Sequence, residues 1–73
     1  MNTNKHLDVR GLSCPEPAMR TRMMLNAISS GTIEILVDSG TAQDNITRIA
    51  QQAGWEIKTE KLSQSEMRMI LSK

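Results

Sequence analysis

The segment TIEILVD, residues 32–38, decides the fold. Ile33, Ile35 and Val37 occupy alternate positions, so they share one face of an extended strand. The segment is also rich in β-branched residues, which are typical of strands in the middle of a sheet. We therefore expect residues 32–38 to form a central strand with one apolar face.

A helix is predicted on each side of this strand. Before it, side chains from Cys14 onward recur at intervals of three and four, the spacing of one helical face, and Gly31 ends the pattern. After it, Thr41 and Asp44 resemble a capping box that opens a second helix, which Gly54 ends. The first helix is predicted to bury Pro17, Ala18, Thr21, Met24, Leu25 and Ile28, and the second Ala42, Ile46, Ile49, Ala50 and Ala53.

Three further alternating runs predict the remaining strands. Leu7 and Val9 alternate with polar neighbours near the N-terminus. Residues 55–59 and 67–71 alternate in the same way on either side of a polar turn at residues 63–65, which indicates a hairpin. The order βαβαββ predicts an α/β (α+β) two-layer sandwich, with a mixed four-stranded sheet and two helices on one face. Polar residues on the strands indicate that the other face stays in water.

Composition restricts the class of protein. With 73 residues, the chain is interpreted as a single domain spanning residues 1–73. A net charge of +1, one Trp and no Phe or Tyr argue against direct nucleic-acid binding. Residues 1–10 lack a signal-peptide pattern, and no apolar run approaches the roughly 20 residues that cross a bilayer. A single cysteine excludes an internal disulfide, so we expect a cytoplasmic protein without membrane contact.

The chemistry concentrates in the segment DVRGLSCPEP, residues 8–17. Proline is favourable in the first turn of a helix, because amide hydrogens there have no acceptor within the helix. We therefore predict Pro15 at the first helical position and Cys14 at or beside the N-cap. The helix dipole, with the Glu16 amide as an available donor, would then favour the nucleophilic thiolate.

Charged neighbours of Cys14 act in opposite directions. The Glu16 carboxylate disfavours a second negative charge on the sulfur, whereas Arg10, Arg20 and Arg22 are close enough in sequence to offset it. The net direction stays open at this point.

A lone cysteine in a cytosolic protein is most often a small buried apolar residue. The two flanking prolines argue against that interpretation for Cys14, because they place it at a stiff turn rather than inside a helix or strand. No second cysteine is available for a redox cycle, and His6 is the only histidine. A metal site, a Cys-His hydrolase and a bound cofactor are therefore not expected.

These residues resemble the signature of the TusA-like sulfur-carrier family, also called SirA-like or YedF-like, whose hallmark is Cys-Pro-x-Pro. In this chain the motif is CPEP, residues 14–17, and it follows Asp8 and the segment RGL at residues 10–12. The resemblance extends over nearly the whole chain, including residues 44–46 and the Gly54-Trp55 junction.

The resemblance implies that Cys14 accepts sulfane sulfur as a persulfide and relays it to an acceptor protein. The donor would be a cysteine desulfurase or a rhodanese-like protein, and the carrier would act as a sulfurtransferase. Related members serve tRNA thiolation, cofactor sulfuration, sulfur oxidation or selenium-related metabolism, and the motif does not choose among these. The alternative is a non-catalytic interaction or regulatory module that uses the CPEP turn as a docking loop. A carrier must expose its sulfur to two partners in turn, so a monomer is the simpler expectation.

Supporting roles are predicted for residues near the motif. Arg10 is the candidate for stabilising an anionic persulfide, because the turn at Gly11 would bend its side chain back toward Cys14. Met19 and Met23, one turn apart, fall opposite the predicted buried stripe and are interpreted either as flanking the core or as an exposed docking patch. Arg20 and Arg22 would surround such a patch.

Overall fold

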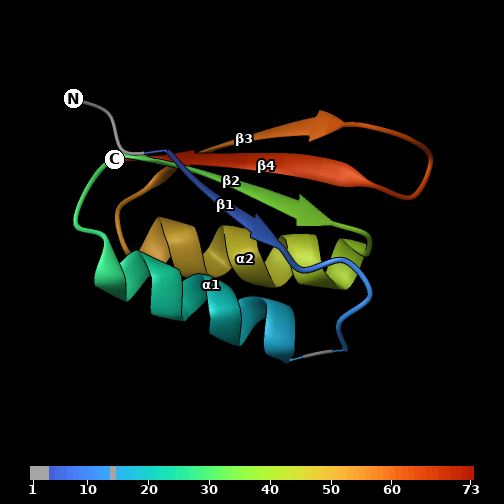
Figure 1. The fold of residues 1–73 in the computed structure, drawn as a ribbon, viewed down its shortest axis with the longest axis horizontal. Coiled ribbons are helices and arrows are strands. Elements are labelled where there is room, and N and C mark those ends of the chain that lie inside the picture. The colour runs from blue at the N-terminus through green and yellow to red at the C-terminus, as the bar shows by residue number, and fades with distance from the viewer. Residues whose placement is uncertain (1–3, 14) are drawn as a thin grey trace.

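The structure, a computed structural model, describes residues 4–13 and 15–73 (Figure 1). Its elements follow the predicted order βαβαββ, and the resulting α+β fold is the predicted two-layer sandwich. Figure 1 shows the sheet as one layer and both helices packed beneath it as the other. The elements are β1 (Asn4–Asp8), α1 (Glu16–Ala27), β2 (Thr32–Val37), α2 (Gly40–Gln52), β3 (Glu56–Lys61) and β4 (Met67–Ser72).

The four strands form one mixed sheet in the order β1-β2-β4-β3. β1 runs parallel to β2, with Leu7 beside Ile35, because α1 crosses over between them. β4 runs antiparallel to both neighbours and places Met69 between Ile35 and Thr59. The predicted central strand and closing hairpin are therefore both present, and β1 and β3 form the two edges.

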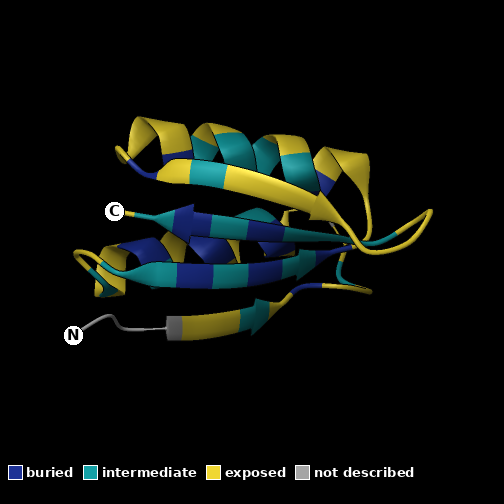
Figure 2. Ribbon diagram, turned by 90° about the horizontal axis from the view of Figure 1, so that it is seen from above, coloured by how far each residue is buried: buried dark blue, intermediate teal, exposed yellow. Residues whose placement is uncertain are grey.

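The core lies between the sheet and the helices. Ile33, Ile35 and Val37 of β2 are 0% exposed, as the alternation predicts, and they face the helices together with residues of β4. Figure 2 shows that burial is concentrated in β2, β4 and the inner sides of the helices. The remaining buried apolar residues of the core are Val9, Leu25, Ala42, Ile46, Ala50, Trp55, Met69 and Leu71.

The helix α1 buries the stripe that the sequence predicts. Pro17, Thr21 and Leu25 are buried, and Met24 and Ile28 pack partly against the core. The Thr21 hydroxyl donates a hydrogen bond of 2.9 Å to the Pro17 carbonyl oxygen, so the polar group in this stripe is satisfied.

The start of α2 differs from the prediction. The N-cap is Ser39, whose Oγ accepts a 3.0 Å hydrogen bond from the amide of Ala42. The predicted capping box of Thr41 and Asp44 is wrong, because the backbone becomes helical at Gly40 and both residues already lie inside the helix. Ser39 retains the extended backbone that an N-cap requires.

The sheet face away from the helices carries charged side chains. Glu34 accepts hydrogen bonds from His6, at 2.7 Å, and from Arg68, at 3.1 Å. Arg68 also forms a 2.7 Å ion pair with Glu60, so one row of hydrogen-bonded polar side chains crosses the sheet from β1 to β3. In the described part of the chain, no helix combines the length and apolar character required to cross a membrane.

Candidate functional site

The predicted sulfur-bearing residue, Cys14, lies outside the described residues. The site is therefore built from the segments on either side of it: residues 9–13, which leave β1, and residues 15–17, which open α1.

The loop after β1 is fixed to the adjacent β2 region by two hydrogen bonds. The amide of Val9 donates to the Leu36 carbonyl oxygen at 3.0 Å, which continues the parallel pairing beyond the end of β1. The amide of Gly11 then donates to the Asp38 carboxylate at 2.8 Å. Gly11 has a φ of 77°, a conformation that side-chain-bearing residues adopt only with strain, so glycine is required at this turn. Asp38 thus holds the turn in place, a role that the sequence prediction missed.

Arg10 is engaged by two carboxylates. Its Nε and Nη2 donate to the two oxygens of Asp8 at 2.9 and 2.8 Å, and its Nη1 donates to Glu66 at 3.4 Å. The hydrogen bonds from Arg10 lower the pKa of Asp8 to about 2. Asp8 in turn raises the pKa of Arg10 above its ordinary value. The guanidinium therefore joins the start of the loop to the β3–β4 hairpin, and its predicted role at a persulfide stays a prediction.

The opening of α1 is shifted by one residue from the prediction. The helix begins at Glu16 with Pro15 as the N-cap residue, so the prediction of Pro15 at the first helical position is wrong. The Glu16 amide donates to the Ser13 carbonyl oxygen at 2.9 Å, so the prediction that it is available to the sulfur is also wrong. The reason is local: a tight turn satisfies this amide, whereas Pro15 and Pro17 have no amide hydrogen to offer.

The charges that were predicted to oppose each other near the motif form an ion pair. The Glu16 carboxylate lies 4.0 Å from the Arg20 guanidinium, one turn further along α1. Both side chains are about half exposed, so the pair is a weak one. The positive charge of Arg20 nevertheless offsets part of the negative charge of Glu16 near the helix opening. Arg22 is exposed and has no ion pair within residues 4–13 and 15–73.

A second helix opens beside the first. Leu12, Pro15 and Pro17 line a small hollow together with Ser39 and Thr41 from the start of α2. Figure 1 shows both helices starting at the same end of the molecule, where β1 and β2 also end. The positive ends of two helix dipoles therefore flank the loop that contains residue 14. The sequence prediction considered α1 alone, although parallel strands that are each followed by a helix could have indicated this convergence.

The predicted docking residues lie on the solvent side of α1. The side chains of Met19 and Met23 are exposed, with 57% and 70% of their surface accessible, so they do not contribute to the core. Arg20 and Arg22 are exposed beside them. The structure therefore brings these four residues onto one surface next to the motif, and their role in docking stays a prediction.

Comparison with known structures identifies the class of fold. The crystal structure of the SirA-like protein from Desulfitobacterium hafniense superimposes with a TM-score of 0.85 at 20% identity, covering 93% of this chain and 95% of that one. The chain therefore has the SirA-like α+β fold.

Sequence comparison identifies the family. A family model described as Sulfurtransferase TusA matches residues 5–73, and the chain belongs to this family. The sulfur carrier protein TusA of Allochromatium vinosum is 33% identical over 72 residues, covering 96% of this chain and 93% of that protein. A protein of Methanocaldococcus jannaschii, named as a candidate sulfur carrier, is 31% identical over 70 residues, covering 94% of this chain and 93% of its own.

Proposed function

We propose that this protein is a cytoplasmic sulfur carrier that holds sulfur as a persulfide on Cys14. It accepts the sulfur from a cysteine desulfurase or rhodanese-like protein and hands it to an acceptor protein. Membership in the TusA family and the sulfur-carrier names of its relatives support this proposal. The observation that carries it is the position of the cysteine loop, whose flanking residues Leu12 and Pro15 lie beside the openings of both helices.

The reaction consists of two exchange steps without net oxidation. The Cys14 thiolate attacks the terminal sulfur of the donor persulfide, the new sulfur–sulfur bond forms, and the donor leaves as a thiolate. An acceptor thiolate then attacks the terminal sulfur on Cys14, and the Cys14 thiolate is the leaving group. The Cys14 sulfur therefore carries negative charge in both steps, first as the attacking thiolate and then as the leaving thiolate. The positive ends of α1 and α2 favour this charge each time.

The residues on both sides of Cys14 are restrained. The Gly11–Asp38 hydrogen bond and the Arg10 contacts to Asp8 and Glu66 tie the upstream part of the loop to the sheet. On the downstream side, Pro15 and Pro17 limit the backbone conformations of the motif. Fewer residues then lose conformational freedom when a partner binds, which favours recognition by two different proteins.

The exposed residues Met19, Arg20, Arg22 and Met23 form the proposed docking surface for these partners. Apolar methionine side chains adapt to differently shaped surfaces, and the neighbouring guanidinium groups would contact acidic groups on the partner. The Met23→Glu variant should fold normally and slow sulfur transfer. Gln51→Glu, which adds the same charge at an exposed position of α2 beside β3, is the matched control. Unchanged transfer in Met23→Glu would remove this surface from the proposal.

The alternative is an interaction module in which the CPEP turn serves as a docking loop and the thiol has no role. The hydrogen bond from Glu16 to Ser13 favours it, because this bond removes one donor from the helix opening and leaves a rigid turn. The two functions differ in whether sulfur becomes attached to the chain.

Intact-mass measurement separates them. The wild-type protein is incubated with a cysteine desulfurase and cysteine, and separately with a rhodanese and thiosulfate. We expect one added sulfur atom on the wild type and none on Cys14→Ser. Circular dichroism of both proteins shows that the variant is folded. A wild-type protein that acquires no sulfur from either donor would contradict the carrier function and leave the docking module as the better explanation.

A further inference from the structure

The strand β3 is an open edge of the sheet. It pairs with β4 on one side, and its other side has no strand beside it within the described chain. An edge strand presents alternate amide hydrogens and carbonyl oxygens without sheet partners, so it can accept another extended strand. Figure 2 shows that β3 is the more exposed of the two strands of the β3–β4 hairpin. Only Ile57 of this strand is half-buried.

Two charges beside this edge are uncompensated. Glu56 lies opposite Ser72 of β4, and Lys58 lies opposite Ile70, so neither has a charged neighbour across the strand pair. Neither takes part in an ion pair among residues 4–13 and 15–73. Both project from the same face of the strand, because they are two residues apart.

The neighbouring Glu60 is different. It lies opposite Arg68 and forms a 2.7 Å ion pair with it. The unsatisfied charges of β3 are therefore confined to its first half, where a negative and a positive side chain flank Ile57.

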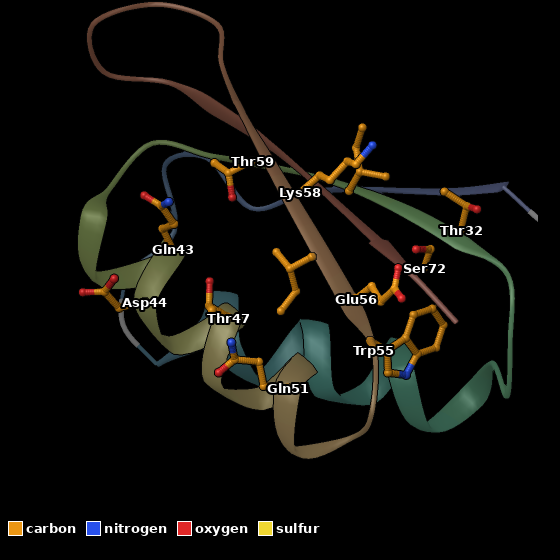
Figure 3. A pocket seen from close by; sticks show the side chains of 12 residues that line it. Thr32, Gln43, Asp44, Thr47, Gln51, Trp55, Glu56, Lys58, Thr59 and Ser72 are labelled. Atoms are coloured by element: carbon orange, nitrogen blue, oxygen red, sulfur yellow. The ribbon is translucent and has the colours of Figure 1, made fainter.

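A groove follows the same edge and extends around it from the helix side to the open face, where Thr32, Ile70 and Ser72 also line it. Gln43, Thr47 and Gln51 line it from α2, and Ile57 and Thr59 line it from β3. In Figure 3 Gln43 and Thr47 extend from α2 into the groove, Thr59 points toward them from β3, and the Gln51 side chain is turned along the helix toward Thr47. The three α2 residues recur every four residues, so they form one polar row along the helix. Glutamine and threonine side chains both donate and accept hydrogen bonds, so this row can bond to polar groups of a strand added at the edge.

We propose that the β3 edge is a self-association surface, at which a second copy of this chain pairs antiparallel with β3 about Ile57. In this register Glu56 lies opposite Lys58 of the second copy, and Lys58 lies opposite Glu56 of the second copy. Ile57 meets Ile57 across the two-fold axis, and the added strand lies beside the polar row of α2. Glu56 and Lys58 discourage pairing with strands that do not offer the opposite charges, and they favour pairing with a second β3 strand.

Neighbouring registers are less favourable. Pairing about Lys58 would place two Lys58 side chains opposite each other and Glu56 opposite Glu60, and like charges at these positions are repulsive. Pairing about Thr59 would direct Lys58 to Glu60, which Arg68 already holds. The register about Ile57 is therefore the one that compensates both unpaired charges.

The dimer should be weak and salt-sensitive. One short strand edge and one helix row bury less surface than the roughly 1,600 Å² of a standard stable interface. Exposed charge pairs also lose strength as ionic strength rises. The segment before Cys14 leaves β1, at the edge of the sheet opposite β3, so this inference is independent of the sulfur-carrier function.

Sedimentation equilibrium from micromolar to millimolar protein, in low and high salt, tests the surface. Each of the variants Lys58→Glu and Glu56→Lys should weaken the wild-type dimer by about tenfold, because two symmetric pairs become repulsive. The double variant Glu56→Lys/Lys58→Glu should return to within about threefold of the wild type. An equimolar mixture of the two single variants should also associate. Lys5→Glu, the same charge change on the opposite edge strand β1, is the control and should have no effect.

Other outcomes overturn the proposal. A wild-type protein that stays monomeric at millimolar concentration and low salt contradicts it, and the edge is then free for an extended segment of another protein. Association that Lys58→Glu leaves unchanged, that Lys5→Glu weakens equally, or that the double variant fails to restore places the contact elsewhere. Circular dichroism of every variant distinguishes lost association from lost folding.

Discussion

The two faces of the sheet are built from the same strands but meet different surroundings. On the face beneath the helices, Ile33, Ile35 and Val37 are fully buried. On the opposite face, Glu34 of the same strand lies between His6, to which it is hydrogen-bonded, and Arg68, with which it forms an ion pair, and this face stays in contact with solvent (Figure 2). Alternate residues of one strand thus serve packing on one side and solvation on the other.

The comparison teaches where stability resides. Removing apolar surface from water contributes roughly 25 cal/mol per Å², and the covered face does this for every second residue. Exposed ion pairs contribute little, because water and salt screen them. Substitutions on the two faces should therefore differ strongly in their effect on the free energy of unfolding.

The largest effect is expected at Ile35. The Ile35→Ala variant should lower the free energy of unfolding by about 2–5 kcal/mol, because it leaves a cavity between β2 and the helices. Urea denaturation measures the loss. Leu36→Ala, the next residue on the open face, is the control and should lose much less. If Ile35→Ala does not fold, Ile35→Val should lose about 0.5–1.5 kcal/mol. Equal losses at Ile35 and Leu36 would contradict the distinction between the faces.

The second effect concerns the helix layer that keeps the covered face dry. Ser39→Ala should cost about 1 kcal/mol, because it removes the acceptor of the Ala42 amide at the start of α2. Thr41→Ala provides the matched comparison, since the structure assigns no capping role to Thr41. A larger loss for Thr41→Ala in urea denaturation would restore the capping box that the sequence predicts.

The third effect is a pH dependence from Asp8, which lies in register with the open face. Arg10 lowers the pKa of Asp8 from 3.8 to about 2 in the folded protein. This pair therefore stabilises the fold fully above about pH 4, and the contribution is lost as the pH falls through about 2. The urea midpoints at about pH 5 and about pH 2.5 should differ less for Asp8→Asn than for the wild type, because the variant has no carboxylate to protonate. Identical pH profiles would show that the pair does not contribute in solution.

The smallest effect is expected at Arg68. Arg68→Gln removes the ion pairs to Glu34 and Glu60, which are partly exposed on the open face. Glu34 then loses one of the partners that lower its pKa, although the hydrogen bond from His6, the larger cause, remains. We expect a small decrease of the urea midpoint in low salt and none in high salt. A decrease that salt leaves unchanged would indicate a packing role for the arginine stem instead.

Much of the fold could be predicted because its signals are local. The alternation around Ile35 and the spacing of Pro17, Thr21 and Leu25 report which side chains face the core, and burial in the structure follows them. Helix starts were predicted less well, because neighbouring residues are chemically similar. Ser39 and Thr41 can both cap a helix, and the backbone conformation at Ser39 decides between them.

The sequence motif of the candidate site could be predicted, but the contacts between the residues around it could not. The CPEP motif at residues 14–17 indicates a reactive thiol and the TusA-like family from residue types alone. The contact from Arg10 to Glu66 joins residues 56 positions apart, so no local pattern could indicate that the guanidinium turns toward the hairpin.

By itself, the sequence determined the layer order, the apolar face of each element and the identity of the motif, because these depend on residue type and periodicity. Only the tertiary structure decided that the opening of α2 lies beside Pro15 and Pro17, and that Asp38 holds the turn at Gly11. It also decided that β3 lies at an edge, with Glu56 and Lys58 uncompensated. These features depend on which strands pair and in which direction, and pairing is fixed by the collective burial of β2 and β4 rather than by any one segment.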